Sequence, residues 1–299
     1  MNIQPPHLKR GDKIAIVCPA NKLKKSIAPA IALLETWGLQ VIQGKSIHAD
    51  HFQFAGDDKL RTADLQRFLD DTDIKAILAA RGGYGGIRII DQLDFTRFNK
   101  NPKWIAGFSD TTALLSHIQA VFHTQSIHGQ MPASFEAGTP LSLETLRKAL
   151  FGEKLHYAYT STAINRPGKA EGVLIGGNLS LLVAMQGSVS EMDYSGKVLF
   201  LEDVGEHEYA IDRMLRMLKR GGKLARLKGL VIGAFNEIEP QEIPFGQTPE
   251  ELIMDIVREY DYPVCFNFPA GHIPDNHALI IGRAAVIAVN DYEVNLSYQ

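Results

Sequence analysis

The sequence predicts an α/β protein of two domains. Its 299 residues are more than one hydrophobic core usually organises, and 45% of them are hydrophobic against 22% charged, as in ordinary globular proteins. The first half alternates short β-branched runs with amphipathic stretches, which is typical of a mostly parallel sheet with helices on both faces. A polar stretch containing Pro167 and Gly168 follows. We therefore expect a parallel, flavodoxin-like sheet domain at 1–155, a linker at 156–172 and a smaller mixed α/β domain at 173–299.

In the first domain, each expected strand is a short apolar run that ends at a turn. These strands are 13–20, 39–44, 74–80 and 104–108. The segments between them have helical character, because their apolar residues recur on one face; these are 26–38, 57–71, 87–93 and 111–122. Leu60, Leu65 and Phe68 form such a stripe, with charged residues on the opposite side.

The second half has a looser pattern of strands around one clear helix. Apolar runs at 173–185, 197–206, 227–235 and 262–272 predict strands. The helix is expected at 209–222, where Gly221 and Gly222 end it. The final segment, 278–298, alternates like a β-hairpin around Asn290 and Asp291.

Charge and composition exclude several classes of protein. A formal net charge of −3 gives no reason to expect a nucleic acid or an anionic membrane as partner. The two cysteines, Cys18 and Cys265, lie far apart in apolar runs, so buried thiols explain them better than a disulfide. None of the ten histidines has zinc-ligand spacing, so we expect no metal site. The first residues, "MNIQPPHLKRGDK", have no apolar core of signal-peptide length, and no apolar run is long enough to span a membrane, which predicts a cytoplasmic protein.

A glycine-rich turn, "RGGYGG" at 81–86, follows the strand at 74–80. Its glycines allow positive φ and let backbone N–H groups approach a ligand, although a flexible strand–helix turn would look the same. The dinucleotide and P-loop patterns are absent, so a phosphate site is not indicated. The remaining functional role for this turn is to supply backbone N–H donors to an anion, such as an oxyanion.

Ser109 and Asp110 stand where the strand at 104–108 meets the next helix. Either residue can cap a helix by accepting hydrogen bonds from first-turn N–H groups. Ser109 can also be a nucleophile at the carboxyl edge of the sheet, where sites in parallel sheets lie. The stretch is not the G-x-S-x-G elbow, because Thr111 replaces the last glycine. The mechanics would be similar, with the N–H of Asp110 available to an oxyanion.

Two further residues follow strands of the second half. Glu202 comes after the apolar run 198–201; a carboxylate there can solvate an edge, pair with an arginine or orient a histidine. His272 follows Gly271 in a turn among glycine and proline. A single histidine is often structural, so position alone distinguishes it.

Taken together, these motifs resemble the LD-carboxypeptidase family of serine peptidases, which includes the microcin C immunity peptidases. The matching stretches are "RGGYG", "GFSD", "IGGNLSLL", "LFLEDVGEHEYAIDRML" and "FPAGH". The resemblance extends over essentially the whole chain, in the same order.

The resemblance implies a nucleophile at Ser109, a triad acid at Glu202 and a base at His272, assembled across the domain interface. It implies hydrolysis through an acyl-enzyme with no cofactor, on murein tetrapeptides from which the terminal D-alanine is removed. The expected oxyanion and substrate-binding groups are Asp110 and the turn with Arg81, Gly82 and Gly83, although Arg81 could equally pair with Asp110. The family also implies a homodimer.

Two alternatives stay open. Within the family, the substrate could be an aminoacyl-nucleotide conjugate, as in microcin C immunity. Outside it, two α/β domains with a site between them also suit a non-catalytic binder of small molecules. The Gly176–Asn178 turn could shape the floor of the site, or Asn178 could simply cap a helix.

Overall fold

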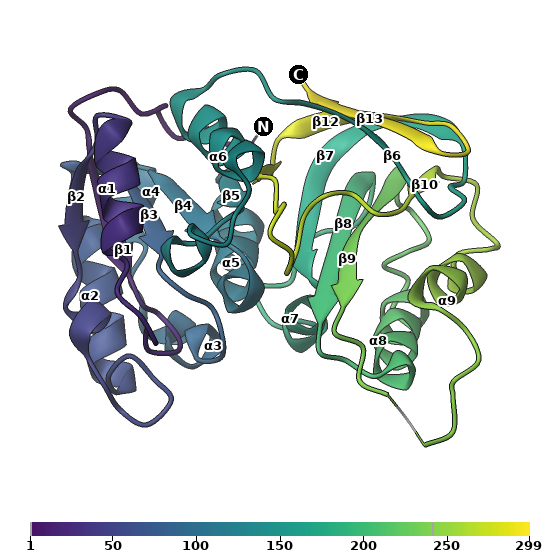
Figure 1. Cartoon of the computed structure of the whole chain (residues 1–299), viewed down its shortest axis with the longest axis horizontal. Coiled ribbons are helices and arrows are strands. Elements are labelled where there is room, and N and C mark those ends of the chain that lie inside the picture. The colour runs from purple at the N-terminus through teal and green to yellow at the C-terminus, as the bar shows by residue number, and fades with distance from the viewer. Residues whose placement is uncertain (1, 241) are drawn as a thin grey trace.

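The computed structural model describes residues 2–240 and 242–299, which form two sheets side by side (Figure 1). The first sheet has the order β11-β5-β4-β3-β1-β2. Its strands are β1 (Lys13–Val17), β2 (Gln40–Gln43), β3 (Ile74–Ala79), β4 (Trp104–Gly107), β5 (Ser126–His128) and β11 (Leu279–Ile281). The first five are parallel in the flavodoxin-like order 2-1-3-4-5, and β11 runs antiparallel to β5.

Helices cover both faces of the first sheet, as the alternation predicted. The α-helices are α1 (Ala28–Thr36), α2 (Asp58–Asp70), α3 (Gly86–Ile89), α4 (Thr96–Lys100), α5 (Thr112–Phe122) and α6 (Pro140–Phe151). Short 3₁₀ turns are η1 (Lys45–His48), η2 (Ile90–Gln92), η3 (Ser109–Thr111) and η4 (Pro132–Ser134). Ile14 and Ile16 of β1 pack into the core that includes α1 and α6, whereas Ala15 and Val17 face the core with α2, α4 and α5. Consecutive residues of a strand point to opposite faces, so β1 is buried on both.

The second sheet has the order β10-β9-β8-β7-β12-β13-β6. Its strands are β6 (His156–Thr160), β7 (Gly168–Asn178), β8 (Lys197–Val204), β9 (Gly229–Asn236), β10 (Val264–Cys265), β12 (Ala284–Val289) and β13 (Glu293–Tyr298). Strands β7 to β10 are parallel, and β12, β13 and β6 add antiparallel neighbours. The helices α7 (Leu179–Ala184), α8 (Glu208–Arg220) and α9 (Pro249–Ile256) cover one face. The other face joins the core that contains α1 and α6. The mixed α/β class is therefore confirmed.

The segment 156–172 is not a linker. Residues 156–160 are β6, paired with β13, and residues 168–172 are the start of β7, paired with β12. These strands are polar because one of their faces meets solvent; in β6, Tyr157 is buried while its neighbours His156 and Ala158 are exposed. Because polar residues recur along both strands, the sequence was interpreted as a polar linker between the domains.

The closing hairpin is confirmed in part. Strands β12 and β13 pair antiparallel, with Val289 opposite Val294 across the turn. The preceding residues, 279–281, do not belong to this hairpin but form β11 in the first sheet. Gly282 has φ of +87°, a conformation that suits glycine, where the chain leaves one sheet for the other. No helix in the described residues is both long and apolar enough to cross a membrane.

Candidate active site

Ser109 lies at the carboxyl end of β4, in the sharp turn that leads through η3 into α5. Its φ is +61°, a left-handed conformation that side-chain-bearing residues seldom adopt. Such strain persists only where the surrounding structure enforces it, and it concentrates at functional sites. Here the flanking strand and helix hold it, and the Ser109 side chain is partly accessible. Its geometry thus matches an exposed nucleophile on a strand–helix elbow.

The capping role of Ser109 and Asp110 is wrong. Neither η3 nor α5 has a side-chain hydrogen bond at its N-cap. The buried Asp110 carboxylate instead accepts the N–H groups of Gly85 (3.1 Å) and Gly86 (2.8 Å), at the start of α3. Burial raises the pKa of Asp110 to about 6, against the opposing effect of these N–H groups. Asp110 therefore connects the serine turn to the glycine-rich turn.

The glycine-rich turn faces the serine directly. A side chain at Gly82 would lie 2.9 Å from Cβ and 3.0 Å from Oγ of Ser109. Gly83 has φ of +107° and faces Asn21, so a side chain would be strained there as well. The glycine-rich turn can come this close to Ser109 only because glycine carries no side chain.

Arg81 does not pair with Asp110. Its guanidinium donates to the carbonyl of Lys22 at 2.6 Å and is partly buried. It also lines a hollow of about 270 Å³ between residues 23–30 and 132–136. Among the described residues, no carboxylate is hydrogen-bonded to the Arg81 guanidinium, which lies beside the glycine turn.

Glu202 and His272 come together from distant parts of the second half. Nδ1 of His272 lies 2.8 Å from Oε2 of Glu202, whose side chain is fully buried. Glu202 lies within β8 rather than after it, since the strand extends to Val204. A side chain at Gly271 would approach within 3.0 Å of Glu202, so this glycine allows the histidine turn to come close.

Burial of His272 opposes a positive charge on the ring and lowers its pKa, but Glu202 more than compensates. The hydrogen bond and negative charge of Glu202 raise the pKa of His272 above its ordinary value of 6.5. The carboxylate also fixes the tautomer, because the ring nitrogen that faces it carries a proton. The other nitrogen, Nε2, is then the one able to accept a proton.

The serine turn and the histidine turn meet through Phe108. The ring of Phe108, the residue before Ser109, lies edge-on to His272 with ring centroids 4.9 Å apart. A second contact joins the halves where Asn178 donates its N–H to Oγ1 of Thr112 at 3.2 Å. The structure therefore brings all three predicted triad residues to one junction between the two sheets.

Asn178 caps α7 and also contacts Asp203, a residue that the sequence motifs did not single out. Its side-chain oxygen accepts the N–H of Leu181, as a cap does. Its amide donates to Asp203 at 2.9 Å, and Asp203 also accepts the N–H of Ser180. Burial raises the pKa of Asp203 to about 6. The signal that could have identified Asp203 is its position next to Glu202, because two neighbouring acids in a strand face opposite sides of the sheet.

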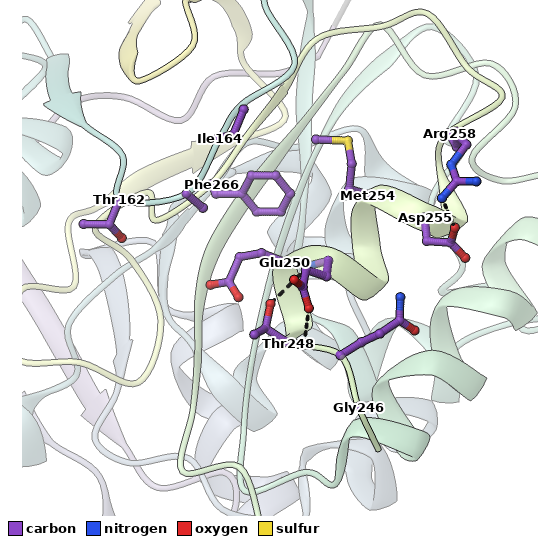
Figure 2. A pocket seen from close by; sticks show the side chains of 12 residues that line it. Thr162, Ile164, Gly246, Thr248, Glu250, Met254, Asp255, Arg258 and Phe266 are labelled. Atoms are coloured by element: carbon purple, nitrogen blue, oxygen red, sulfur yellow. Dashed lines mark hydrogen bonds and ion pairs between the residues drawn. The ribbon is translucent and has the colours of Figure 1, made fainter. Parts of the chain in front are cut away.

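A large surface hollow of about 820 Å³ lies elsewhere, between residues 162–164 and α9 (Figure 2). No predicted site residue lines it, and four of its polar side chains pair with one another. Thr248 and Glu251 form a capping box, and Asp255 pairs with Arg258. This hollow is not the candidate active site. In the described residues, no three His, Cys, Asp or Glu side chains gather as metal ligands would.

Comparison with known proteins agrees with this arrangement. Residues 14–129 match the LD-carboxypeptidase N-terminal domain and residues 171–287 match the C-terminal domain of that family. A probable murein peptide carboxypeptidase of Bacillus subtilis (strain 168) is 35% identical over 96% of this chain and 92% of its own length. The crystal structure of muramoyltetrapeptide carboxypeptidase from Oxalobacter formigenes has a TM-score of 0.86 at 28% identity, covering 96% and 98% of the two chains.

A third relative carries a different name. The microcin C7 self-immunity protein MccF of Escherichia coli is 25% identical over 90% of this chain and 87% of its own length. Both family domains match and span most of the chain in the expected order. The chain belongs to the LD-carboxypeptidase family, and it is a hydrolase of the serine carboxypeptidase type.

Proposed function

We propose that this enzyme removes the C-terminal D-alanine from murein tetrapeptides with Ser109, His272 and Glu202 as its catalytic triad. The observation that carries the proposal is the 2.8 Å bond between buried Glu202 and His272 at the junction where Ser109 stands in a left-handed turn. The muramoyltetrapeptide carboxypeptidase of similar structure supports the choice of substrate.

Each triad residue has a role that follows from its surroundings. His272 takes the proton of Ser109 through Nε2 as the hydroxyl attacks the peptide carbonyl, and later gives it to the leaving D-alanine amine. Glu202 holds the ring through Nδ1 and offsets the charge that the ring gains. Water then hydrolyses the acyl-enzyme with the same base, so the cycle needs no cofactor.

Backbone N–H groups would stabilise the tetrahedral intermediate. The donors we assign are the N–H of Asp110, after the nucleophile, and one from the turn of Gly82 and Gly83, which lies against Ser109. One such donor contributes about 3–4 kcal/mol to transition-state stabilisation in other hydrolases. The bond of Asp110 to the glycine turn would keep both donors in register.

A carboxypeptidase must also bind the free carboxylate of its substrate. We assign this role to Arg81, whose partly buried guanidinium follows β3 next to Gly82. An arginine can bind a carboxylate through two parallel hydrogen bonds. Its present bond to the Lys22 carbonyl would orient it.

The test is D-alanine release from a purified murein tetrapeptide. Wild type should release it, and Ser109→Ala should be slower by roughly 10⁴- to 10⁶-fold, because the nucleophile is lost. Ser195→Ala is the control, since this serine is exposed and precedes β8, near whose other end Glu202 lies. Equal rates for Ser109→Ala and wild type would remove Ser109 as the nucleophile.

The MccF relative favours a second candidate, an amidase acting on aminoacyl-nucleotide conjugates. Both substrates can be offered to the same protein. Cleavage of an aminoacyl sulfamoyl adenosine without D-alanine release would select the amidase. No hydrolysis of either, together with no reaction of Ser109 with a phosphonate, would favour a binding protein.

We also propose that the enzyme is a homodimer, as the family resemblance suggests, and that it is cytoplasmic. Light scattering on the protein as it elutes from a size-exclusion column would give a mass of twice 33.0 kDa for a dimer. Fractionation of cells that express the protein would test the compartment.

A further inference from the structure

Arg61 is a buried cation that belongs neither to the proposed triad nor to its oxyanion donors. It lies near the start of α2, and its side chain is completely buried. An arginine is almost never fully buried unless it is paired, because taking its charge out of water is costly. The groups that it binds therefore indicate its role.

The Arg61 guanidinium joins three segments that are far apart in sequence. Nη1 donates to the carbonyl of Pro19, in the turn after β1, and at 3.0 Å to the carbonyl of Gly85, in the glycine-rich turn after β3. Nη2 donates to Asp58, which also pairs with Arg88 of α3 at 2.7 Å. Helices α2 and α3 are in contact (Figure 1). One buried side chain thus links α2 to two turns at the carboxyl edge of the first sheet.

The peptide group between Gly85 and Gly86 lies between Arg61 and Asp110. Its C=O accepts a hydrogen bond from Arg61 at 3.0 Å, and its N–H donates to the Asp110 carboxylate at 2.8 Å. The N–H of Gly85 donates to the same carboxylate at 3.1 Å. Hydrogen bonds at the two ends of one peptide group strengthen each other, because each of them polarises the group. A buried cation and a buried anion therefore fix the orientation of this peptide.

This bridge, from Arg61 through the Gly85–Gly86 peptide to Asp110, connects the glycine-rich turn to the serine turn. A side chain at Gly85 would lie 2.6 Å from Nη1 of Arg61, so the approach of the two groups requires glycine. Asp110 follows Ser109 directly, and Gly82, at the other end of the glycine-rich turn, lies against the Ser109 side chain. The bridge therefore determines how the backbone of the turn lies relative to the proposed nucleophile.

The charge of Arg61 also acts on Asp110 itself. Burial raises the pKa of Asp110 to about 6, and the N–H groups of Gly86 and Gly85 and the charge of Arg61 oppose this effect. At neutral pH the carboxylate is therefore charged and can accept both N–H groups.

We propose that Arg61 is a positioning residue, which holds the glycine-rich turn against Ser109 through the Gly85–Gly86 peptide and Asp110, so that the assigned oxyanion donors stay in place. Arg61 does not touch the substrate, because its side chain is completely buried. The inference rests on the proposed triad and oxyanion donors, but not on the identity of the substrate.

Arg61→Met removes the cation and its hydrogen bonds but keeps much of the side-chain stem. We expect kcat to fall about 10- to 100-fold, the usual effect of losing a hydrogen bond to a charged group, while KM changes little. Arg67→Met is the matched control, because Arg67 is an exposed arginine of the same helix, and its activity should equal that of wild type. A kcat of Arg61→Met equal to that of the control would overturn the proposal.

A double variant separates the bridge from general packing. Asp110→Asn acts at the other end of the bridge, since an amide offers one acceptor oxygen where the carboxylate offers two. If both residues act through the same peptide, the double variant should have a kcat within about twofold of the slower single variant. Losses that multiply would show that Arg61 acts independently of Asp110, which contradicts the bridge.

Hydrogen–deuterium exchange gives a readout that does not depend on activity. In Arg61→Met the N–H groups of Gly85 and Gly86 should exchange about tenfold faster or more, with exchange in β8 unchanged. If Arg61→Met does not fold, Arg61→Lys replaces it, because one ammonium nitrogen cannot bind Asp58 and both carbonyls as the guanidinium does. Exchange at the two glycines equal to that of wild type, in whichever variant folds, would also overturn the bridge.

The rate at which a fluorophosphonate labels Ser109 distinguishes this proposal from the proposed function. Labelling should slow in the Arg61 variant by the same factor as kcat. No labelling of wild type would reject the proposed nucleophile, and the exchange measurement would still test the bridge. Faster exchange with an unchanged labelling rate would show that the bridge is structural only and would overturn the positioning role.

Discussion

Ser109 shows how a single backbone angle prepares a residue for chemistry. A left-handed serine is strained, at a cost of about 1–3 kcal/mol that the fold must offset elsewhere. The sequence located this residue through its motif and its place between strand and helix. It could not reveal the angle, because serine in that place is equally compatible with an ordinary cap. Only the contacts of the turns around it decide the conformation.

The pH dependence of the reaction should report the bond between Glu202 and His272. The base must be neutral, and its pKa is raised, so kcat/KM should rise with pH through a midpoint above 6.5. In Glu202→Gln the largest effect that opposes burial is gone, although Asp203 and Glu237 still raise the His272 pKa, so the midpoint should move to lower pH than in wild type while kcat falls on the order of 10³-fold or more.

Rates of D-alanine release from pH 5 to 9 would measure this shift. Glu206→Gln is the matched control, because Glu206 lies just beyond the end of β8, the strand that carries Glu202. An acid limb that stays in place in Glu202→Gln would contradict the assignment of His272 as the titrating base.

Gly82 should be intolerant of any side chain. The added methyl group of Gly82→Ala would lie about 3 Å from the Ser109 side chain and displace it. We expect a loss in kcat on the order of 10²-fold with an unchanged far-ultraviolet spectrum, since displacements of this size at a nucleophile have such effects. Gly221→Ala, at the end of α8, is the control, and equal kcat values for the two variants would argue against close packing.

At the scale of elements, the sequence predicted what hydrophobic periodicity encodes. Strands β1 to β4 were predicted, because burial on both faces makes runs such as β1 and β3 largely apolar, whereas β5, α4 and α6 were not. Strand β6 was missed because it is an edge strand with one solvated face. The contribution of β11 to the first sheet was also missed, since pairing between segments more than 150 residues apart leaves no local signal.

The pairing of β7 with β8 depends on Gly176. This residue has φ of +123°, and a side chain would overlap the carbonyl oxygen of Phe200. Gly176→Ala should therefore lower the free energy of unfolding by at least about 2 kcal/mol, through both strain and displacement of β8.

Urea unfolding would measure that change against Gly187→Ala. Gly187 also has a positive φ, of +76°, but no atom lies within 4 Å of where its side chain would be. Its variant should lose only about 1 kcal/mol, the effect of the backbone angle alone. Equal losses in the two variants would show that the contact with β8 has no energetic weight.

For the whole molecule, the shared core matters more than the division into two sheets. Buried residues of β1, β4 and α6 belong to the same cluster as Leu174, Val198 and Phe200 of the second sheet. Strand β11 adds a backbone connection to the first sheet from the far end of the chain. The sequence predicted a site between two domains but not how firmly they are joined.

We expect the two halves to unfold together. Both tryptophans, Trp37 and Trp104, lie in the first half, so their fluorescence follows that half alone, whereas far-ultraviolet circular dichroism follows both. The two signals should give the same midpoint in urea, because neither half retains its core without the other. Midpoints that differ by more than the fitting error would show independent domains.

The crossing of the chain from β10 to β11 also sets the order of events during synthesis. The first sheet is incomplete until Leu279–Ile281 have left the ribosome, about 150 residues after β5. Until then the edge of β5 is unpaired, and a chain that stops before His272 has the serine but no base. If the proposed triad holds, a chain that stops before His272 is inert as a hydrolase, and it exposes a strand edge that favours aggregation unless a chaperone covers it.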